Sequence, residues 1–387
     1  MQAETPTQVI FLSTYPPREC TVAAYTHELI QELKTRPEIE PKVIAVTHAS
    51  QRYSGEVMAQ FSQDHWFSHL AAADIINESP ADFLMVEHGY DIYGGAHGIF
   101  LLDLLDRVAL PYFVTCHHVP SRPLPAQREI MAELGHASQG VVVLSKHCRR
   151  VLAEVYGIPP QRVAVLPRGV AEPGTADREA LKAASGLSGK PVVCSYGLFT
   201  PDKGFEYGIR AVAEVAKRHP DVQYLLLGNT HPDTLKTEGE TYRNSLHQLA
   251  RDLGIERNVH FIQRPLTLAE IQHFLLMCDI FVSPYPDWQP TVSNALAYAV
   301  SCGRIAVSTP YLYAQELLAE GRGLLAHFED AHSLAACIDI LIENPELRAE
   351  MEQNVLRYGH MMAWPQVAGQ YVDYFQAMAQ NLQAPPA

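Results

Sequence analysis

The stretch PVVCSYGLFTPDKG, residues 191–204, joins a short apolar run to a turn and then to a helical pattern. The apolar run predicts a buried strand and Gly197 a tight turn, and a helix is expected to begin near Gly204 with Lys203 at its start. A helix N-terminus offers unpaired N–H groups to an anion, and a lysine beside it adds a charge that suits phosphate. This is no Walker motif, because Phe205 stands where a magnesium-binding Ser or Thr would be. Alone, the stretch also fits an ordinary strand–turn–helix joint, so its place in the chain decides its meaning.

Apolar runs bounded by turns recur along the chain and alternate with helical patterns. In the first half, strands are expected at 9–12, 43–46, 83–87, 112–115, 141–144 and 163–166. In the second half, strands are expected at 192–195, 223–227, 259–262, 280–283 and 305–308. Such alternation is typical of parallel sheets covered by helices on both faces. The polar stretch 171–190, which contains Gly and Pro, separates the halves and is interpreted as an interdomain connection.

The sequence therefore predicts an α/β fold with two Rossmann-like, parallel-sheet domains facing across a cleft. The first domain is expected over residues 1–170 and the second over 171–359, with an amphipathic helix at 360–383 packing back on the first. Ligands of such sheets bind at the carboxyl ends of the strands. Because residues 191–204 form the first strand–turn–helix of the second sheet, we expect Lys203 to face the cleft.

Composition excludes several classes of protein. The 387 residues are 47% hydrophobic and 19% charged, which is typical of a globular chain long enough for two cores. A net charge of −14 argues against nucleic acid or an anionic membrane as a partner. No apolar run is long enough for a transmembrane segment, and the N-terminus lacks a signal-peptide pattern. The seven cysteines form no CxxC pair, so we expect free thiols, a cytoplasmic protein and no metal site on them. No oligomeric state is predicted.

Several motifs in a fixed order carry a resemblance. They are STYPPREC (13–20), EHGYDIYGG (87–95), VTCHHVP (114–120), GLFTPDKG (197–204) and SCGRIAVSTPYLYAQELL (301–318). Together they resemble the retaining glycosyltransferases of family 4, which have the GT-B fold. The resemblance implies transfer of a sugar from a UDP- or GDP-sugar, possibly GDP-mannose, to a carbohydrate or small-molecule acceptor. It also implies that no metal or other cofactor is required.

The resemblance implies two catalytic positions. His117 falls where the family has a histidine near the donor sugar, and Lys203 falls on the lysine that neutralises the diphosphate. Fixed positive charge there would stabilise the charge that develops on the leaving group. His118 points the opposite way from His117 along the strand and is interpreted as packing or surface.

On the donor side the chain departs from the family. The usual arginine five or six residues before the lysine is replaced by Leu198 and Gly197. Three arginines are candidates to replace it, with a surface or structural role as the alternative for each: Arg168, Arg264 and Arg304. Of these, Arg264 is predicted to bind the donor.

The acidic pair of the family is also absent, because its positions hold Pro290 and Tyr298. Tyr298, Asn294 and Ser293 are expected to contact the donor instead, although a neutral group makes a weaker bond than a carboxylate. Thr291 joins this predicted donor set, and its alternative role, shared with Ser293, is to cap the following helix. Tyr298 is alternatively a core residue.

On the acceptor side the resemblance implies contacts from two loops. The predicted residues are Glu19, Cys20, Thr21, His88 and Tyr90. For the last two, the alternative is a strand-end turn with no ligand.

Two other functions remain open from the sequence. The loss of the ribose-binding carboxylate also suits a sugar phosphorylase or an epimerase-like enzyme of the same fold, whose donor lacks a nucleoside. The loss of both the acidic pair and the arginine suits a non-catalytic, glycosyltransferase-like binding partner.

Overall fold

The structure, a computed structural model, describes residues 6–18, 20–53, 55–230, 232–288 and 292–383. The chain divides into two compact units, each described here by itself. Unit 1 consists of Met1–Gly169 and Trp364–Ala387, and unit 2 of Val170–Ala363. Among the described residues, no helix combines the length and the apolar character needed to cross a membrane.

Unit 1 is built on a parallel sheet of seven strands in the order β3-β2-β1-β4-β5-β6-β7. Its strands are β1 (Thr7–Ser13), β2 (Ile39–Thr47), β3 (Val57–Ser62), β4 (Phe83–His88), β5 (Tyr112–Cys116), β6 (Gly140–Val143) and β7 (Val163–Val165). Its helices are α1 (Thr21–Leu33), α2 (Trp66–Asn77), η1 (Ala96–Gly98), α3 (Phe100–Leu105), α4 (Pro125–Ala137), α5 (Lys146–Tyr156), η2 (Pro160–Arg162) and α15 (Trp364–Gln383).

Side chains alternate between the two faces of this sheet, as the pleat of a strand requires. Phe11 and Phe83 point to the face covered by α1 and α15, where Phe375 packs against their rings at 6.2 and 5.3 Å. The opposite set, which includes Leu12 and Val86, packs under α2, α3, α4 and α5. Because both faces are covered, the strands read as nearly continuous apolar runs.

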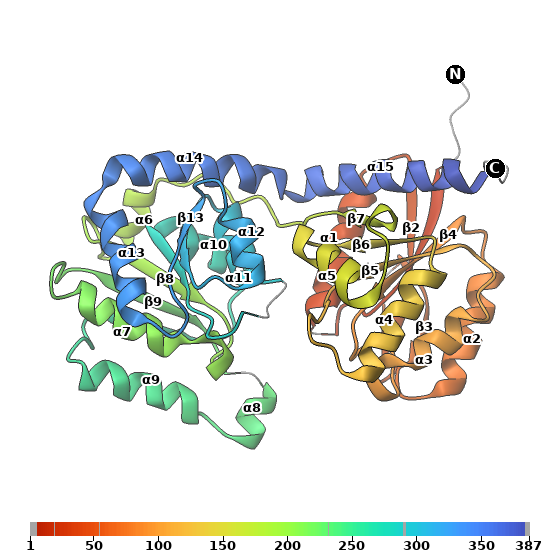
Figure 1. Cartoon of the computed structure of the whole chain (residues 1–387), viewed down its shortest axis with the longest axis horizontal. Helices are drawn as coiled ribbons and strands as arrows, with labels where there is room; N and C mark the ends of the chain where they lie inside the picture. The colour runs from red at the N-terminus through yellow and green to blue at the C-terminus, as the bar shows by residue number, and fades with distance from the viewer. Residues whose placement is uncertain (1–5, 19, 54, 231, 289–291, 384–387) are drawn as a thin grey trace. The chain divides into compact units, whose positions relative to one another are not determined.

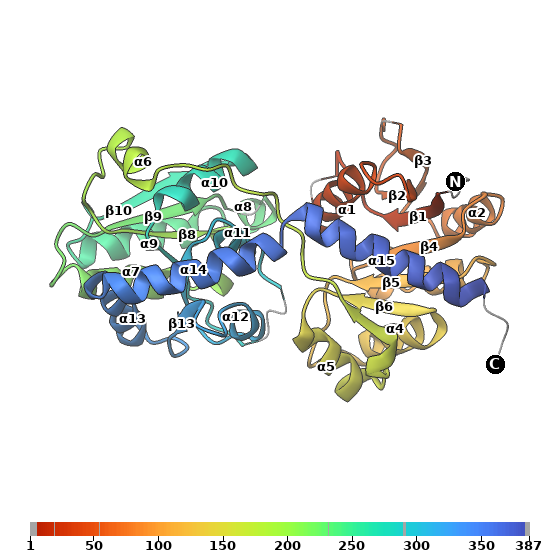
Figure 2. The same ribbon diagram turned by 90° about the horizontal axis from the view of Figure 1, so that it is seen from above.

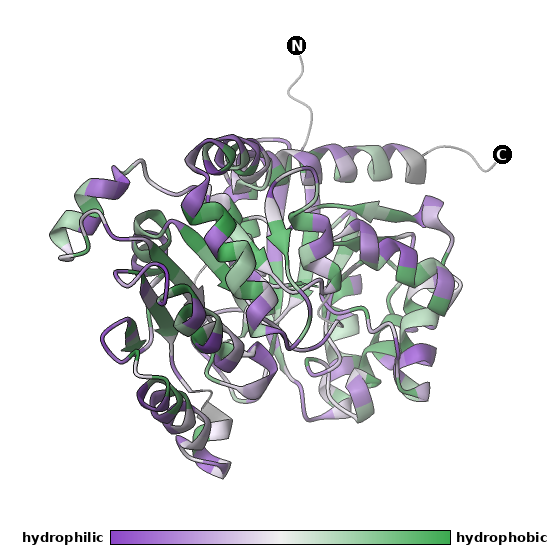
Figure 3. Cartoon of the chain, turned by 60° about the vertical axis from the view of Figure 1, so that its left-hand side comes forward, coloured by the Kyte–Doolittle hydropathy of each residue, from purple (hydrophilic) through white to green (hydrophobic). Residues whose placement is uncertain are grey.

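Unit 2 is built on a second parallel sheet, of six strands in the order β10-β9-β8-β11-β12-β13. Its strands are β8 (Val192–Tyr196), β9 (Gln223–Gly228), β10 (Val259–Gln263), β11 (Ile280–Ser283), β12 (Ile305–Ser308) and β13 (Gly323–Leu325). Its helices are α6 (Arg178–Ala184), η3 (Pro201–Lys203), α7 (Phe205–Val215), α8 (Pro232–Thr237), α9 (Thr241–Asp252), α10 (Leu268–Met277), α11 (Asn294–Ser301), α12 (Leu312–Leu317), α13 (Ala331–Glu343) and α14 (Pro345–Met361). In Figure 3 the strands of both sheets are mainly hydrophobic, whereas the helices carry hydrophilic residues as well.

The predicted α/β class with two Rossmann-like units is confirmed. Two strands, β3 and β13, were not predicted, because the first is half-exposed and the second has only three residues. The stretch 171–190, interpreted as an interdomain connection and included in the predicted second domain, carries the helix α6. This stretch belongs to unit 2, where Lys182 of α6 is buried and pairs with Asp279 at 2.7 Å.

The boundaries between the units fall after Gly169 and after Ala363. The C-terminal helix begins at Trp364, so His360 and Met361 of the predicted 360–383 helix belong to α14 instead. Trp364 donates a hydrogen bond to Glu28 of α1 at 2.9 Å, and Tyr371 shares one with Tyr25 at 2.7 Å. These contacts hold α15 against α1 within unit 1.

Candidate active site

The sheet of unit 2 changes direction of winding between β8 and β11, since β8 has β9 on one side and β11 on the other. In open α/β sheets, ligands bind at the carboxyl ends of the strands at such a switch point. The chain after β8 forms the turn 197–204, and the chain after β11 leads through Tyr285 to α11. Both stretches therefore lie where the fold is expected to bind a ligand.

Lys203 is the cation at this switch point. It ends the short helix η3, and its side chain is 26% exposed. Its ammonium group pairs with the Asp202 carboxylate at 2.8 Å and lies 4.8 Å from the centre of the Tyr285 ring. Burial alone would lower the pKa of Lys203, but Tyr285 and Asp202 outweigh burial and raise it. The side chain is therefore a fixed positive charge over the whole neutral range.

Two glycines permit the tight packing of this loop. Gly204, between η3 and α7, has φ = 65°, and a Cβ there would lie 2.1 Å from the carbonyl oxygen of Pro284. Gly228 has φ = 140°, and a Cβ there would lie 1.8 Å from the carbonyl oxygen of Gly197. Only glycine meets both constraints at either position. These glycines bring the β8 loop against the chain that follows β9 and β11.

Tyr285 supports Lys203 from the β11 side. Its ring stacks on Tyr311 with 4.7 Å between centroids, and its hydroxyl shares a hydrogen bond with Ser293 at 3.2 Å. The Tyr311 hydroxyl in turn shares a hydrogen bond with Ser283 at 2.9 Å. Each aromatic side chain is thus held at both its ring and its hydroxyl. The result is a rigid aromatic support under a charged group.

The predicted donor residues on α11 lie next to this support. Ser293 is buried and caps α11 by accepting a hydrogen bond from the Leu296 amide at 3.3 Å, as the capping interpretation expects. Asn294 begins the helix and is half-buried. Tyr298, one turn later, is also half-buried and lies near Tyr196, whose pKa burial and this neighbour raise to about 12.

The structure describes some of the other predicted donor residues but not all of them. Gly197 and Leu198 belong to the β8 loop, and Leu198 is 36% exposed. Thr291 lies outside the described residues.

Arg264 does not join this group. It follows the edge strand β10, and its guanidinium pairs with Glu270 of α10 at 2.5 Å. Glu270 also receives a hydrogen bond from the Thr267 amide, so both residues belong to the start of α10. Arg304 is buried and donates to the backbone carbonyls of Cys302 and Cys278 at 3.0 and 3.2 Å. Both arginines therefore have partners outside the Lys203 loop in this structure.

In unit 1 the corresponding edge carries a buried acid–histidine pair. His117 follows β5, and its Nε2 lies 2.6 Å from a carboxylate oxygen of Glu87 in β4. Glu87 is fully buried, and its other oxygen accepts a hydrogen bond from Thr115 at 3.2 Å. The His117 side chain is 10% exposed and packs edge-on against Tyr25 at 4.8 Å. These contacts fix the orientation of the His117 imidazole and leave Nδ1 without a hydrogen-bond partner among the described residues.

A buried cation also lies next to Tyr25. The Arg168 guanidinium is 5.5 Å from the centre of the Tyr25 ring, and Arg168 is only 2% exposed. No hydrogen bond or ion pair of Arg168 occurs within the described part of the chain, and its Nε is buried without a partner. Burial and the Glu87 charge raise the pKa of Tyr25, so its hydroxyl stays neutral. Tyr25 thus contacts both His117 and Arg168.

The predicted acceptor-side residues fall into two places. His88 ends β4, is 1% exposed and contacts the Tyr90 ring at 4.9 Å. Burial, with a smaller contribution from His117 and His118, lowers the pKa of His88 to about 3, so it is neutral. The Tyr90 hydroxyl donates to the Gln127 carbonyl at 3.1 Å.

The second place is the start of α1. Cys20 caps α1 through a 3.4 Å contact from the Ala23 amide, Thr21 is its exposed first residue, and Glu19 lies outside the described residues.

Some residues at the carboxyl edges of the two sheets were not predicted from the sequence. Tyr285 and Asp202 hold Lys203, and Tyr25 and Tyr371 surround the Glu87–His117 pair. The only local signal was an aromatic residue directly after a strand, in Ser283-Pro-Tyr285. Contacts such as that of Lys203 with Tyr285 join residues far apart in sequence, and no sequence motif predicts them.

The geometry defines a class of protein: two doubly wound α/β units, one with a lysine at its switch point and the other with a buried acid–histidine pair at the same edge. Matches to the models of known protein families support this class of protein. Residues 177–357 match the family model of the glycosyl transferases group 1, and residues 22–172 match that of glycosyltransferase family 4.

Two curated relatives extend the match. A GDP-mannose-dependent alpha-(1-6)-phosphatidylinositol monomannoside mannosyltransferase of Mycolicibacterium smegmatis is 26% identical over 284 residues, 69% of this chain and 71% of the relative. A D-inositol 3-phosphate glycosyltransferase of Corynebacterium aurimucosum is 27% identical over 327 residues, 78% of this chain and 73% of the relative.

Solved structures show the same fold. Anabaena Alr3699/HepE in complex with UDP matches with a TM-score of 0.77 at 16% identity, covering 96% of this chain and 100% of that one. A sucrose-phosphate synthase from Thermosynechococcus elongatus matches with a TM-score of 0.78 at 14% identity, covering 97% and 100%. The chain belongs to glycosyltransferase family 4, and it is a glycosyltransferase with the GT-B fold.

Proposed function

We propose that this enzyme moves a sugar from a nucleoside diphosphate sugar to a carbohydrate or small-molecule acceptor, with retention at the anomeric carbon and without a metal. The observation that carries the proposal is the Lys203 ammonium at the switch point of unit 2, fixed by Asp202 and Tyr285. Support for retention comes from membership of the family alone.

The chemistry of the leaving group explains the role of Lys203. Cleavage of the bond between sugar and diphosphate leaves negative charge on the diphosphate, and a preorganised ammonium stabilises that charge. The N-termini of α7 and α11 follow the β8 and β11 loops and add partial positive charge at the same edge. Because these groups supply fixed positive charge, we propose that no metal is needed for this step.

We propose GDP-mannose as the first donor to test and a UDP-sugar as the second. The relative from M. smegmatis is named as GDP-mannose-dependent, and the Anabaena structure contains UDP. Ser293, Asn294 and Tyr298 are proposed to contact the nucleoside. Their neutral groups would hold ribose hydroxyls by weaker bonds than a carboxylate provides.

His117 is proposed to contact the transferred sugar, and Glu87 to hold the His117 ring in position. A carboxylate that accepts from Nε2 leaves Nδ1 as the ring atom able to meet a sugar hydroxyl. Cys20, Thr21, His88 and Tyr90 remain proposed acceptor-side residues, and among them Thr21 is exposed at the start of α1. We further propose a cytoplasmic enzyme, because all seven cysteines are free thiols.

A panel of nucleotide sugars tests the proposal. The purified chain is incubated with GDP-, UDP- and ADP-sugars and candidate acceptors, and release of the nucleoside diphosphate is measured with and without a chelator. We expect acceptor-dependent release from one donor, unchanged by the chelator, with the anomeric configuration of the product seen by NMR to match the donor. Absence of release from every donor, or loss of release with the chelator at an unchanged unfolding temperature, would contradict the proposal.

A further inference from the structure

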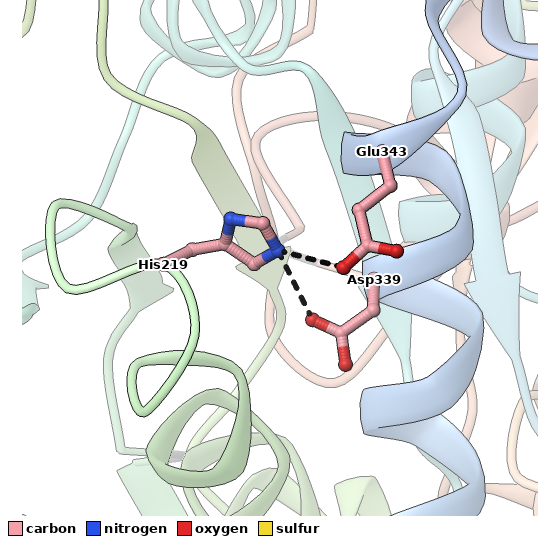
Figure 4. Close-up of side chains that lie close together, drawn as sticks. All are labelled: His219, Asp339 and Glu343. Atoms are coloured by element: carbon pink, nitrogen blue, oxygen red, sulfur yellow. Dashed lines mark hydrogen bonds and ion pairs between the residues drawn. The ribbon is translucent and has the colours of Figure 1, made fainter.

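Three potential metal ligands meet in unit 2, away from Lys203. His219 lies in the connection from α7 to β9, so it sits at the amino edge of the sheet, opposite the carboxyl edge that holds Lys203. Asp339 and Glu343 lie one turn apart near the end of α13, which packs beside α7. Figure 4 shows the imidazole and the two carboxylates pointing toward one another.

The distances suit one ion. Nε2 of His219 lies 3.3 Å from an oxygen of Glu343 and 3.6 Å from an oxygen of Asp339, and all three ligand atoms lie within 4.8 Å of one another. Ligands held tetrahedrally around zinc at its usual bond lengths are separated by about 3.3 Å. The cluster therefore needs only small side-chain rotations to close around a cation.

Asp339 gives an independent indication of a ligand. It is only 4% exposed, and within the described residues its two carboxylate oxygens have ion-pair contacts but accept no hydrogen bond. Arg218, whose side chain is 58% exposed, forms an ion pair with one of these oxygens, and the other oxygen faces His219. A buried carboxylate normally has its hydrogen bonds satisfied, so the state of Asp339 calls for a further positive partner.

The position of Asp339 and Glu343 on α13 also favours the binding of a cation. Asp339 and Glu343 are like charges four residues apart, a spacing that destabilises a helix. They also lie at the C-terminal end of α13, where the helix dipole is negative and no basic residue occurs in the last turn. With a neutral histidine the three ligands carry two negative charges and the paired Arg218 one positive charge, so the cluster is net negative and attracts a cation.

We propose that His219, Asp339 and Glu343 bind a divalent transition-metal cation, with zinc the best match and water completing its coordination. One imidazole and two carboxylates suit zinc, whereas magnesium prefers an octahedral shell of oxygens. The cation has a path from solvent, because the Glu343 and His219 side chains are 52% and 23% exposed. Bound there, it links α13 to the connection between α7 and β9 and stabilises unit 2.

The test uses the full chain, stripped with a chelator and dialysed against zinc or magnesium. Bound metal is measured by elemental analysis, affinity by competition with a chromogenic chelator, and stability by thermal unfolding. The variants are His219→Ala and Glu343→Gln. The control is His332→Ala, which removes another exposed histidine of the same helix pair, bound to Glu214 at 2.8 Å outside the cluster. All variants keep the seven cysteines, so binding to thiols is common to every sample.

We expect one zinc per chain, a rise in the unfolding temperature with zinc and none with magnesium. Both cluster variants should lose this zinc or bind it at least about 10-fold more weakly, and the control should bind like the wild type. Equal zinc binding in the wild type and the cluster variants, or none in the wild type, would overturn the proposal and leave His219 as an ion-pair partner of α13. Sugar transfer is not the readout, so this result is independent of the proposed function.

Discussion

The carboxyl edges of the two sheets differ in how deeply their charged side chains are buried. In unit 1 the Glu87 carboxylate is fully buried and meets His117 at 2.6 Å, while Arg168 is buried next to Tyr25. In unit 2 the Lys203 ammonium is partly exposed and meets a carboxylate that is itself 65% exposed. One edge holds its charges inside the protein, and the other keeps its charge at the surface.

This difference in burial indicates that the two edges have different roles. A buried carboxylate is costly to leave unpaired, so Glu87 serves to fix the geometry of His117. An exposed ion pair contributes little to stability, so the exchange of Asp202 for a phosphate that the proposed function requires of Lys203 would cost little. Variants at the carboxyl edge of unit 1 are therefore expected to affect stability and activity together, and variants at the carboxyl edge of unit 2 activity alone.

The largest expected effect comes from Lys203→Ala. Loss of one preorganised charge at a leaving group lowers kcat/KM by about 100- to 1000-fold. The unfolding temperature should stay unchanged, because the pair with Asp202 is exposed. The control is Lys217→Ala, an exposed lysine just beyond α7, which should behave as the wild type. Steady-state kinetics with the active donor provide the measurement, and a fall of less than about 10-fold would contradict the role of Lys203.

Glu87→Gln tests the buried edge. The amide keeps the shape but gives a weaker hydrogen bond to His117 and removes the negative charge near Arg168. We expect a loss of about 1–3 kcal/mol in stability and roughly a 10-fold fall in kcat. Glu28→Gln is the matched control, because Glu28 accepts a hydrogen bond from Trp364 in the same unit but lies outside the pair. Equal losses in both variants would remove the special role of Glu87.

The lowered pKa of His88 predicts that the stability of the fold depends on pH. Its pKa is about 3 in the folded chain, below the ordinary value of 6.5, so the unfolded chain binds the proton first. The stability due to neutral His88 is complete above pH 6.5 and is lost progressively as the pH falls toward 3. At about pH 5 the loss is about 2 kcal/mol. Urea unfolding at about pH 7.5 and about pH 5 measures it, and His88→Phe should reduce the loss by that amount. An identical loss in the variant would show that His88 titrates normally.

The smallest effect is expected for Asp202→Asn. This change removes the carboxylate that competes with phosphate for Lys203, so a nucleoside diphosphate should bind a few-fold more tightly. The gain should shrink at high salt, because screening weakens the exposed pair in the wild type. Calorimetric titration at low and high salt provides the measurement. Weaker binding by the variant would mean that Asp202 positions Lys203 instead of competing for it.

The sequence predicted what local patterns control. The strand–turn–helix around Gly197 and Lys203 follows from an apolar run, a glycine and a helical pattern within fourteen residues. Ser293 was expected to cap a helix because a serine precedes the helical pattern, and it does so. The central strands of both sheets, such as β4, β9 and β11, were recognisable because they are short apolar runs buried on both faces.

The rest depends on contacts between distant residues. Arg264 was expected at the donor site from its charge alone, but the turn before α10 brings it to Glu270. The pair of Glu87 with His117 joins two neighbouring strands, and its distance depends on their register. The metal ligands lie on two segments more than one hundred residues apart, and only packing of α13 beside α7 brings them together.

The central claim is that Lys203 binds the diphosphate of the donor, and calorimetric titration tests it most directly. GDP, UDP and their nucleosides are titrated into the wild type and into Lys203→Met. The account predicts that the variant binds the preferred diphosphate at least about 10-fold more weakly, whereas the matching nucleoside binds both proteins alike. Equal affinity of the diphosphate for both proteins would contradict it.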